Sequence, residues 1–149
     1  MATKSAPSAL TVPAPQINRI RMASLGALTM LIIQFILGTA YAIYGTAPAS
    51  GKPIGMFSSP LLAVHVVMGI LLIIAAVMLV VRALQAKVAP LTVTSVIGLV
   101  AILGAFGAGS AFSGSGSDGA SLAMALLTAV AMMAYAAALV ISGKPQAGH

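Results

Sequence analysis

Cysteine and tryptophan are absent from this chain of 149 residues, and Asp118 is its only acidic residue. Without cysteine, neither a disulfide nor a thiolate metal site can form. Charged residues make up 5% of the sequence, against about 25% in ordinary soluble proteins. Since so few charges cannot cover a soluble surface, lipid must surround most of the chain.

Motifs typical of enzymes and of proton-coupled transporters are also missing. The sequence contains no GxSxG, HExxH, P-loop or dinucleotide-binding pattern, and a single acid cannot form a catalytic carboxylate pair. No charged side chain lies in the core of an apolar segment, where exporters usually titrate a carboxylate. The basic residues form no cluster of the kind that binds nucleic acid. Any chemistry would have to come from a cofactor, so the sequence favours a protein that is not an enzyme.

What the sequence does contain is four long apolar segments, which cover residues 23–44, 60–81, 91–111 and 120–142. Each has roughly 20 residues and can cross a hydrocarbon core of about 30 Å as a helix. Because lipid offers no hydrogen-bond partners to the backbone, helices are the expected structure. The sequence therefore predicts an all-α integral membrane protein, a four-transmembrane-helix antiparallel bundle.

Proline, glycine and serine mark the expected connections. Residues 1–22 are rich in proline, alanine and serine and predict a disordered tail. Residues 45–60 predict a loop, residues 83–90 a short turn and residues 113–119 a flexible glycine/serine hairpin loop. Residues 143–149 predict a short C-terminal tail.

The basic residues predict the orientation in the membrane. If the four segments alternate, Lys52 and Asp118 lie on one side, and all other charged residues lie on the opposite side. The latter are Lys4, Arg19, Arg21, Arg82, Lys87 and Lys144. We therefore expect a multi-pass protein of the inner (plasma) membrane with both termini in the cytoplasm.

Small residues four positions apart predict close helix contacts in the third and fourth segments. Gly104 and Ala108 form one such pair, and Ala125 and Ala129 form another. Packing within the molecule is the favoured interpretation. The alternative is contact with other chains, either in a homo-oligomer or with other membrane protein subunits.

His65 stands alone among apolar residues, about 8 Å inside the second segment at the rise of an α-helix. An ionisable group at that depth is costly and indicates a functional site by default. A structural hydrogen bond to a neighbouring helix, ligation of haem iron and contact with the membrane interface all stay open as its role.

Two stretches, QFILGTAYAIYG (34–45) and HVVMGILLIIAAVMLVVRAL (65–84), resemble the first two helices of one four-helix half of haem A synthase. Gln34, Leu37 and Gly38 match the first-helix pattern of that family. His65 matches the histidine of the second helix, and Leu103-Gly104 matches the third helix. The resemblance implies a four-helix bundle in which His65 ligates the iron of a b-type haem.

This chain also departs from the family at two positions. Ser121 stands where the fourth helix would carry its histidine, and the apolar stretch LLAV (61–64) replaces the glutamate before the second-helix histidine. The oxidation of haem is therefore not implied. The second axial ligand would come from Met124 or from His65 of a second chain.

Two functions remain open at this stage. The first is a haem-binding membrane protein associated with a respiratory or other electron-transfer complex. The alternative is a cofactor-free structural or accessory subunit that packs against a larger membrane complex.

Overall fold

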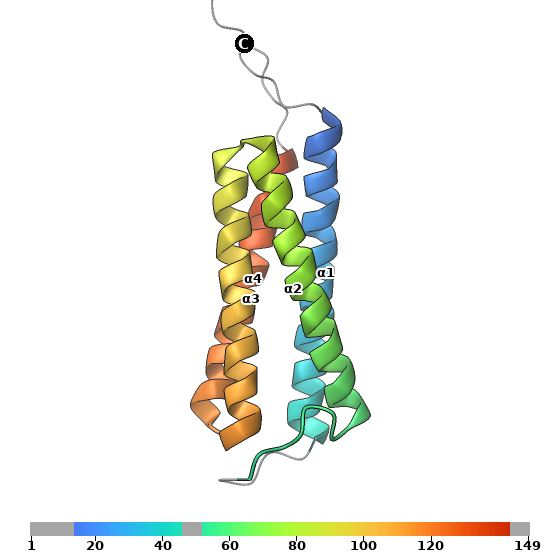
Figure 1. The fold of residues 1–149 in the computed structure, drawn as a ribbon, viewed down its shortest axis with the longest axis vertical. Coiled ribbons are helices and arrows are strands. Elements are labelled where there is room, and N and C mark those ends of the chain that lie inside the picture. The colour runs from blue at the N-terminus through green and yellow to red at the C-terminus, as the bar shows by residue number, and fades with distance from the viewer. Residues whose placement is uncertain (1–13, 46–51, 144–149) are drawn as a thin grey trace, which may run out of the picture.

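The computed structural model of the protein describes residues 14–45 and 52–143. These residues form four α-helices and no strand: α1 (Ala14–Tyr44), α2 (Pro60–Ala86), α3 (Ala89–Ser115) and α4 (Asp118–Gly143) (Figure 1). Each helix is long and apolar enough to cross a membrane. The predicted all-α integral membrane protein is confirmed.

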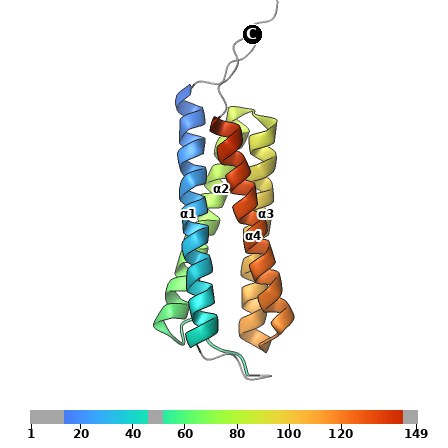
Figure 2. The ribbon, with the colours of Figure 1, turned by 180° about the vertical axis from the view of Figure 1, so that it is seen from behind.

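The helices form an antiparallel bundle in which each helix has two neighbours (Figures 1 and 2). α1 packs against α2 and α4, and α3 packs against the same two helices. Across the described residues, the backbones of the diagonal pairs α1–α3 and α2–α4 do not approach each other closely. Space along the bundle axis therefore has to be filled by side chains or left as a cavity.

α1 begins earlier than the sequence predicts. The helix starts at Ala14, so residues 14–22, expected in a disordered tail, are helical. Proline suits the first turn of a helix, where its missing N–H is not needed, and Pro15 occupies that turn. The composition of the segment therefore misled the prediction. The tail before Ala14, with Lys4, and the tail from Lys144 onward lie outside the described residues.

The two short connections are tighter than predicted. α3 continues to Ser115 and α4 begins at Asp118, so most of the expected glycine/serine loop is helical. Gly116 makes the turn with a φ of 67°, a conformation that glycine adopts without strain. Lys87 adopts a similar conformation between α2 and α3, with a φ of 55°. The backbone N–H of each of these two residues returns to the preceding helix, where it closes the last turn.

The start of α2 sets the depth of His65. The Ser59 hydroxyl caps the helix by accepting a hydrogen bond from the backbone N–H of Leu62 at 3.2 Å. Pro60 occupies the first turn. His65 therefore lies between the first and second turns from this end of the bundle.

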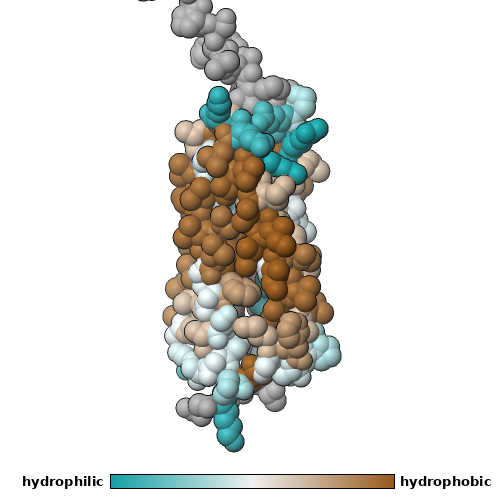
Figure 3. All heavy atoms as spheres, viewed as in Figure 1, coloured by the Kyte–Doolittle hydropathy of each residue, from teal (hydrophilic) through white to brown (hydrophobic). Residues whose placement is uncertain are grey.

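The two ends of the bundle differ in charge. Exposed basic side chains gather at the end where α1 begins and α2 ends (Figure 3), which we call the basic end. They are Arg19, Arg21, Arg82 and Lys87. The opposite end, which we call the cavity end, carries the exposed Lys52 and Asp118 within the described range.

The half of the bundle nearest the basic end holds the packed core. Small side chains let the helices approach closely there, with Ala76, Ala131 and Ala138 wholly buried. Tyr135 is the largest fully buried side chain, and its ring lies on Gly98 of α3. This half is therefore tightly packed, whereas the other half is not.

Candidate functional site: a cavity lined by His65

A cavity of about 380 Å³ lies in the half of the bundle nearest the cavity end. All four helices line it, from Leu31 to Ala42 on α1, Leu62 to Leu72 on α2, Ile102 to Ser113 on α3 and Asp118 to Thr128 on α4. Its volume falls within the range of about 300 to 1,000 Å³ that is common for ligand sites. Figure 3 shows a hollow with hydrophilic atoms inside it on the lower half of the face viewed. The lower ends of the α1–α2 and α3–α4 hairpins stand apart there (Figure 1).

The described part of the α1–α2 loop passes close to this cavity. Met56 contributes to the lining. The backbone N–H of Ile54 donates to the carbonyl of Ser113 at the end of α3, at 2.9 Å. The loop is thus tied to the opposite hairpin beside the cavity.

The polar groups of the lining mostly offer lone pairs. The hydroxyls of Ser110, Ser113 and Thr128 each donate to a carbonyl one turn back on their own helix, at 3.1, 3.0 and 2.8 Å. Because these hydroxyl protons are already used in hydrogen bonds to the backbone, the hydroxyl oxygens can only accept a hydrogen bond from a ligand. No lysine or arginine is part of the lining. The polar residues that line the cavity are Gln34, Thr39, Tyr41, His65, Ser110, Ser113, Asp118, Ser121 and Thr128.

Gln34 of α1 reaches across to α2. Its side-chain Nε2 donates to the backbone carbonyl of His65 at 2.7 Å. A Cβ at Gly69, four residues after His65, would lie 3.2 Å from that Nε2. Since a helical side chain leans back over the preceding turn, the glycine leaves this carbonyl open to Gln34.

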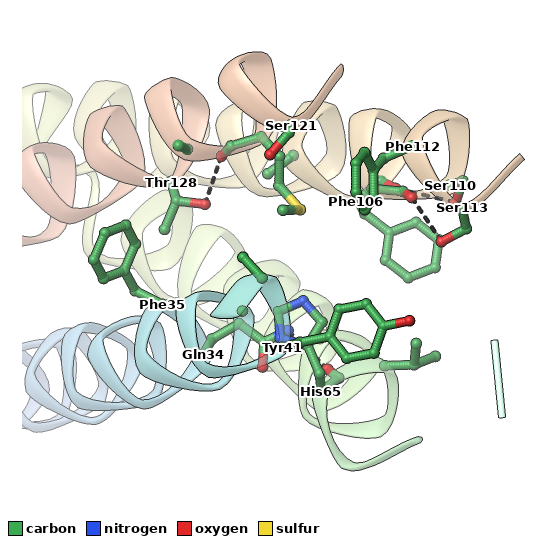
Figure 4. Close-up of a pocket in the computed structure, with 18 of the residues that line it drawn as sticks. Gln34, Phe35, Tyr41, His65, Phe106, Ser110, Phe112, Ser113, Ser121 and Thr128 are labelled. Carbon is green, nitrogen blue, oxygen red and sulfur yellow. Dashed lines mark hydrogen bonds between the residues drawn. The ribbon is translucent and has the colours of Figure 1, made fainter. Parts of the chain in front are cut away.

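His65 of α2 reaches toward α1 in the same way. Its imidazole lies over Gly38, four residues after Gln34, where a Cβ would be 3.2 Å from Cε1 and 3.7 Å from Nδ1. Figure 4 shows the ring beside Gln34 and Tyr41. The Nδ1 of His65 is buried without a hydrogen-bond partner, and so is the Oε1 of Gln34. Gln34 is thus followed four positions later by Gly38, which makes room for His65. In the same way His65 is followed by Gly69, which makes room for Gln34.

The α3–α4 hairpin brings a sulfur atom to the same cavity. Met124 lines it, and a Cβ at Gly109 would lie 3.3 Å from the Met124 Sδ. Ser121, which stands where the resemblance would place a histidine, also contributes to the lining. The structure therefore brings His65, Met124 and Ser121 to one cavity. The His65 ring lies against the backbone of α1 at Gly38.

Two features of the site were not predicted from the sequence. They are the hydrogen bond from the Gln34 side chain to α2 and the serine hydroxyl oxygens of α3 that line the cavity. The spacings Gln34–Gly38 and His65–Gly69 are visible in the sequence, but only the pairing of α1 with α2 gives them a meaning. Within the described residues, no group of three or more histidine, cysteine, aspartate or glutamate side chains could hold a bare metal ion. An iron porphyrin needs less from the protein, because the ring nitrogens already hold the metal and one or two axial ligands suffice.

Fold and site together define a multi-pass helical membrane protein with a mostly apolar cavity, which a few polar side chains also line, inside one half of its bundle. No protein family, curated protein or solved structure matches the chain. The resemblance to haem A synthase therefore rests on the residues quoted above.

Proposed function

We propose that this protein binds a b-type haem in the cavity, with His65 as an axial ligand to the iron, and serves a respiratory or other electron-transfer complex. The observation that carries this proposal is the His65 imidazole, which lines a cavity of ligand size at membrane depth. An ionisable side chain held at membrane depth is costly, and a ligand that it binds would repay that cost.

The glycines around the cavity support the fit of a flat, bulky group. Gly38 and Gly109 both line it, and at each of them a Cβ would press on a side chain that could serve as a ligand. At Gly38 that side chain is His65, and at Gly109 it is Met124. Larger residues at these glycines would take up space beside the two donors.

The donor set also suits haem iron. An imidazole from α2 and a thioether from α4 line the same cavity from different hairpins. When bound, the haem would supply a one-electron redox centre, and a His/Met pair favours the reduced iron more than two histidines do. If Met124 does not ligate, His65 of a second chain is the other candidate.

Absorption spectroscopy tests the proposal. The protein, expressed with ample haem and purified in detergent, should show a Soret band, and His65→Ala should lose it while its helical content and elution volume stay unchanged. Thr128→Val is the matched control, because it removes a polar group from the same cavity without removing a ligand. Wild-type protein without a Soret band would exclude the haem.

The second candidate is a cofactor-free accessory subunit. A glycine on the outer face of α3 favours this candidate. Gly107 of α3 is exposed and has no side chain near it. A bare glycine on a lipid-facing surface lets a foreign helix approach closely. Because the chain has no cysteine, Gly107→Cys provides a unique crosslinking site in native membranes. A crosslinked partner, together with no Soret band, would establish this candidate in place of the first.

A further inference from the structure

A groove of about 400 Å³ lies on the outer surface at the basic end, in the half of the bundle away from the cavity. It lies between the first turns of α1 and the last turns of α4, two helices that pack side by side (Figure 2). We call it the basic-end groove. The residues that line it are Asn18, Arg21, Met22, Leu25, Leu139 and Val140.

The α1 side of the groove changes from polar to apolar along the helix. Its four residues are spaced three or four positions apart, so they share one face of α1. Asn18 and Arg21 lie nearer the basic end, whereas Met22 and Leu25 lie deeper. From Asn18 to Leu25 the helix rises by about 10 Å. The groove therefore has a polar end at the membrane surface and an apolar end within the membrane.

Arg21 brings a positive charge to the polar end of the groove. The side chain is exposed, and the described part of the basic end contains no acid, since Asp118 lies at the cavity end. Side chains of a helix lean toward its N-terminus, which for α1 is the direction of the membrane surface. Arginine can lay its methylene groups on apolar neighbours and keep its guanidinium at that surface. The charge is thus placed where the head groups of lipids lie.

We propose that the basic-end groove binds an anionic phospholipid. The Arg21 guanidinium and the Asn18 amide donate hydrogen bonds to the phosphate oxygens, and an acyl chain lies on the apolar residues of the groove. Basic pockets between transmembrane helices are typical sites for anionic head groups. This proposal goes beyond the haem site and does not depend on it.

Two other occupants fit the groove less well. Contacts between transmembrane helices usually contain small residues, whereas methionine, leucine and valine form the apolar part of this groove. A second apolar helix would also have to cover the charge of Arg21 without neutralising it. Free phosphate would leave the apolar end of the groove empty. A phospholipid matches both ends, and it would contact the first and the last helix of the bundle together.

Native mass spectrometry of the full chain in detergent tests the proposal. The protein is titrated with phosphatidylglycerol and, separately, with phosphatidylcholine that carries the same acyl chains. We expect tighter binding of phosphatidylglycerol. Arg21→Gln should weaken that binding about fivefold, the effect of one basic residue near an anionic lipid, and abolish the preference. Arg19→Gln is the matched control, because it removes the same charge from the same helix but lies outside the groove.

The controls separate the groove from general attraction to the basic end. An equal loss of binding in both arginine variants, or a wild-type protein without preference for phosphatidylglycerol, would overturn the proposal. Displacement of the lipid by an equal concentration of inorganic phosphate would show a simple anion site, which would also overturn it. So would a dimer of the chain that is lost only in Arg21→Gln. Both arginines are exposed, so circular dichroism should show unchanged helical content in either variant. The Soret band reports on the cavity alone, so either proposal can fail without the other.

Discussion

The Gln34 side chain donates to the main-chain carbonyl of His65 at 2.7 Å, and the His65 ring in turn lies on the α1 backbone at Gly38. The contact between α1 and α2 is thus reciprocal. Gln34 of α1 lies at Gly69 of α2, and His65 of α2 lies at Gly38 of α1. This contact places an imidazole at a defined point in the wall of a membrane-embedded cavity.

Filling the space at Gly38 should displace the imidazole. In Gly38→Val the Cβ alone would lie 3.2 Å from Cε1 of His65, and the two methyl groups would add to the crowding. Overpacking of this kind costs about 1 to 3 kcal/mol. We expect a lower melting temperature in detergent and, if haem is bound, a shifted or missing Soret band. Gly26→Val is the control on the same helix, because nothing lies within 4 Å of a Cβ there, and an equal loss of stability in both variants would contradict the assignment.

Gly98→Ala should destabilise the packed half of the bundle. The new Cβ would lie 2.6 Å from Cζ of Tyr135, whose ring is wholly buried, so the ring or the helix would have to shift. In contrast, Gly107→Ala on the same helix meets no neighbour and should gain helix propensity, worth about 1 kcal/mol. Thermal melts followed by circular dichroism should move in opposite directions for the two variants. A neutral Gly98→Ala would show that Tyr135 has freedom to shift.

Gly104 was predicted to lie at a helix contact, and it does, with the Leu127 side chain of α4 against it. A Cβ at this position would be 3.0 Å from Cδ1 of that leucine. Gly104→Leu should therefore lower the melting temperature, and Leu127→Ala in the same chain should restore part of the loss by making room. Failure of the second substitution to help would mean that the damage arises elsewhere along α3.

The orientation of the bundle stays a prediction, and the basic end provides the test. Four exposed cations at this end, with no acid there in the described chain, favour a cytoplasmic location. A fluorescent reporter that matures only in the cytoplasm should be active when fused after Lys144. The same reporter fused after Lys52 should be dark, and the reverse pattern would invert the topology.

Most of the fold could be predicted from sequence because lipid leaves the backbone few choices. The four apolar segments had to be helices, and the short connections had to make them antiparallel. The helix ends could not be predicted as well. Pro15 and the glycine/serine stretch around Ser115 suggest loops by composition, yet both belong to helices here. Outside the membrane, water can hydrogen-bond to the backbone, so these residues can form either a helix or a loop. The apolar character of the segments therefore does not determine where the helices end.

The candidate site was only partly accessible from sequence. His65 is conspicuous as the one ionisable group in its segment, and counting residues gives its depth. Which helix its ring contacts depends on the rotation of α2 against α1, and no local pattern encodes that angle. The contact with Gly38 and the donation from Gln34 therefore came from the structure alone.

The cavity is assembled from all four helices, so it exists only in the folded bundle and is absent from the separated hairpins. A ligand that occupies it consequently binds the native state and has no comparable site on the unfolded chain. Mass action then links occupancy to heat resistance: at a ligand concentration 100 times its Kd, the native state gains about 2.7 kcal/mol. Resistance to heating in detergent can thus rank candidate ligands, coloured or colourless, before any activity is known.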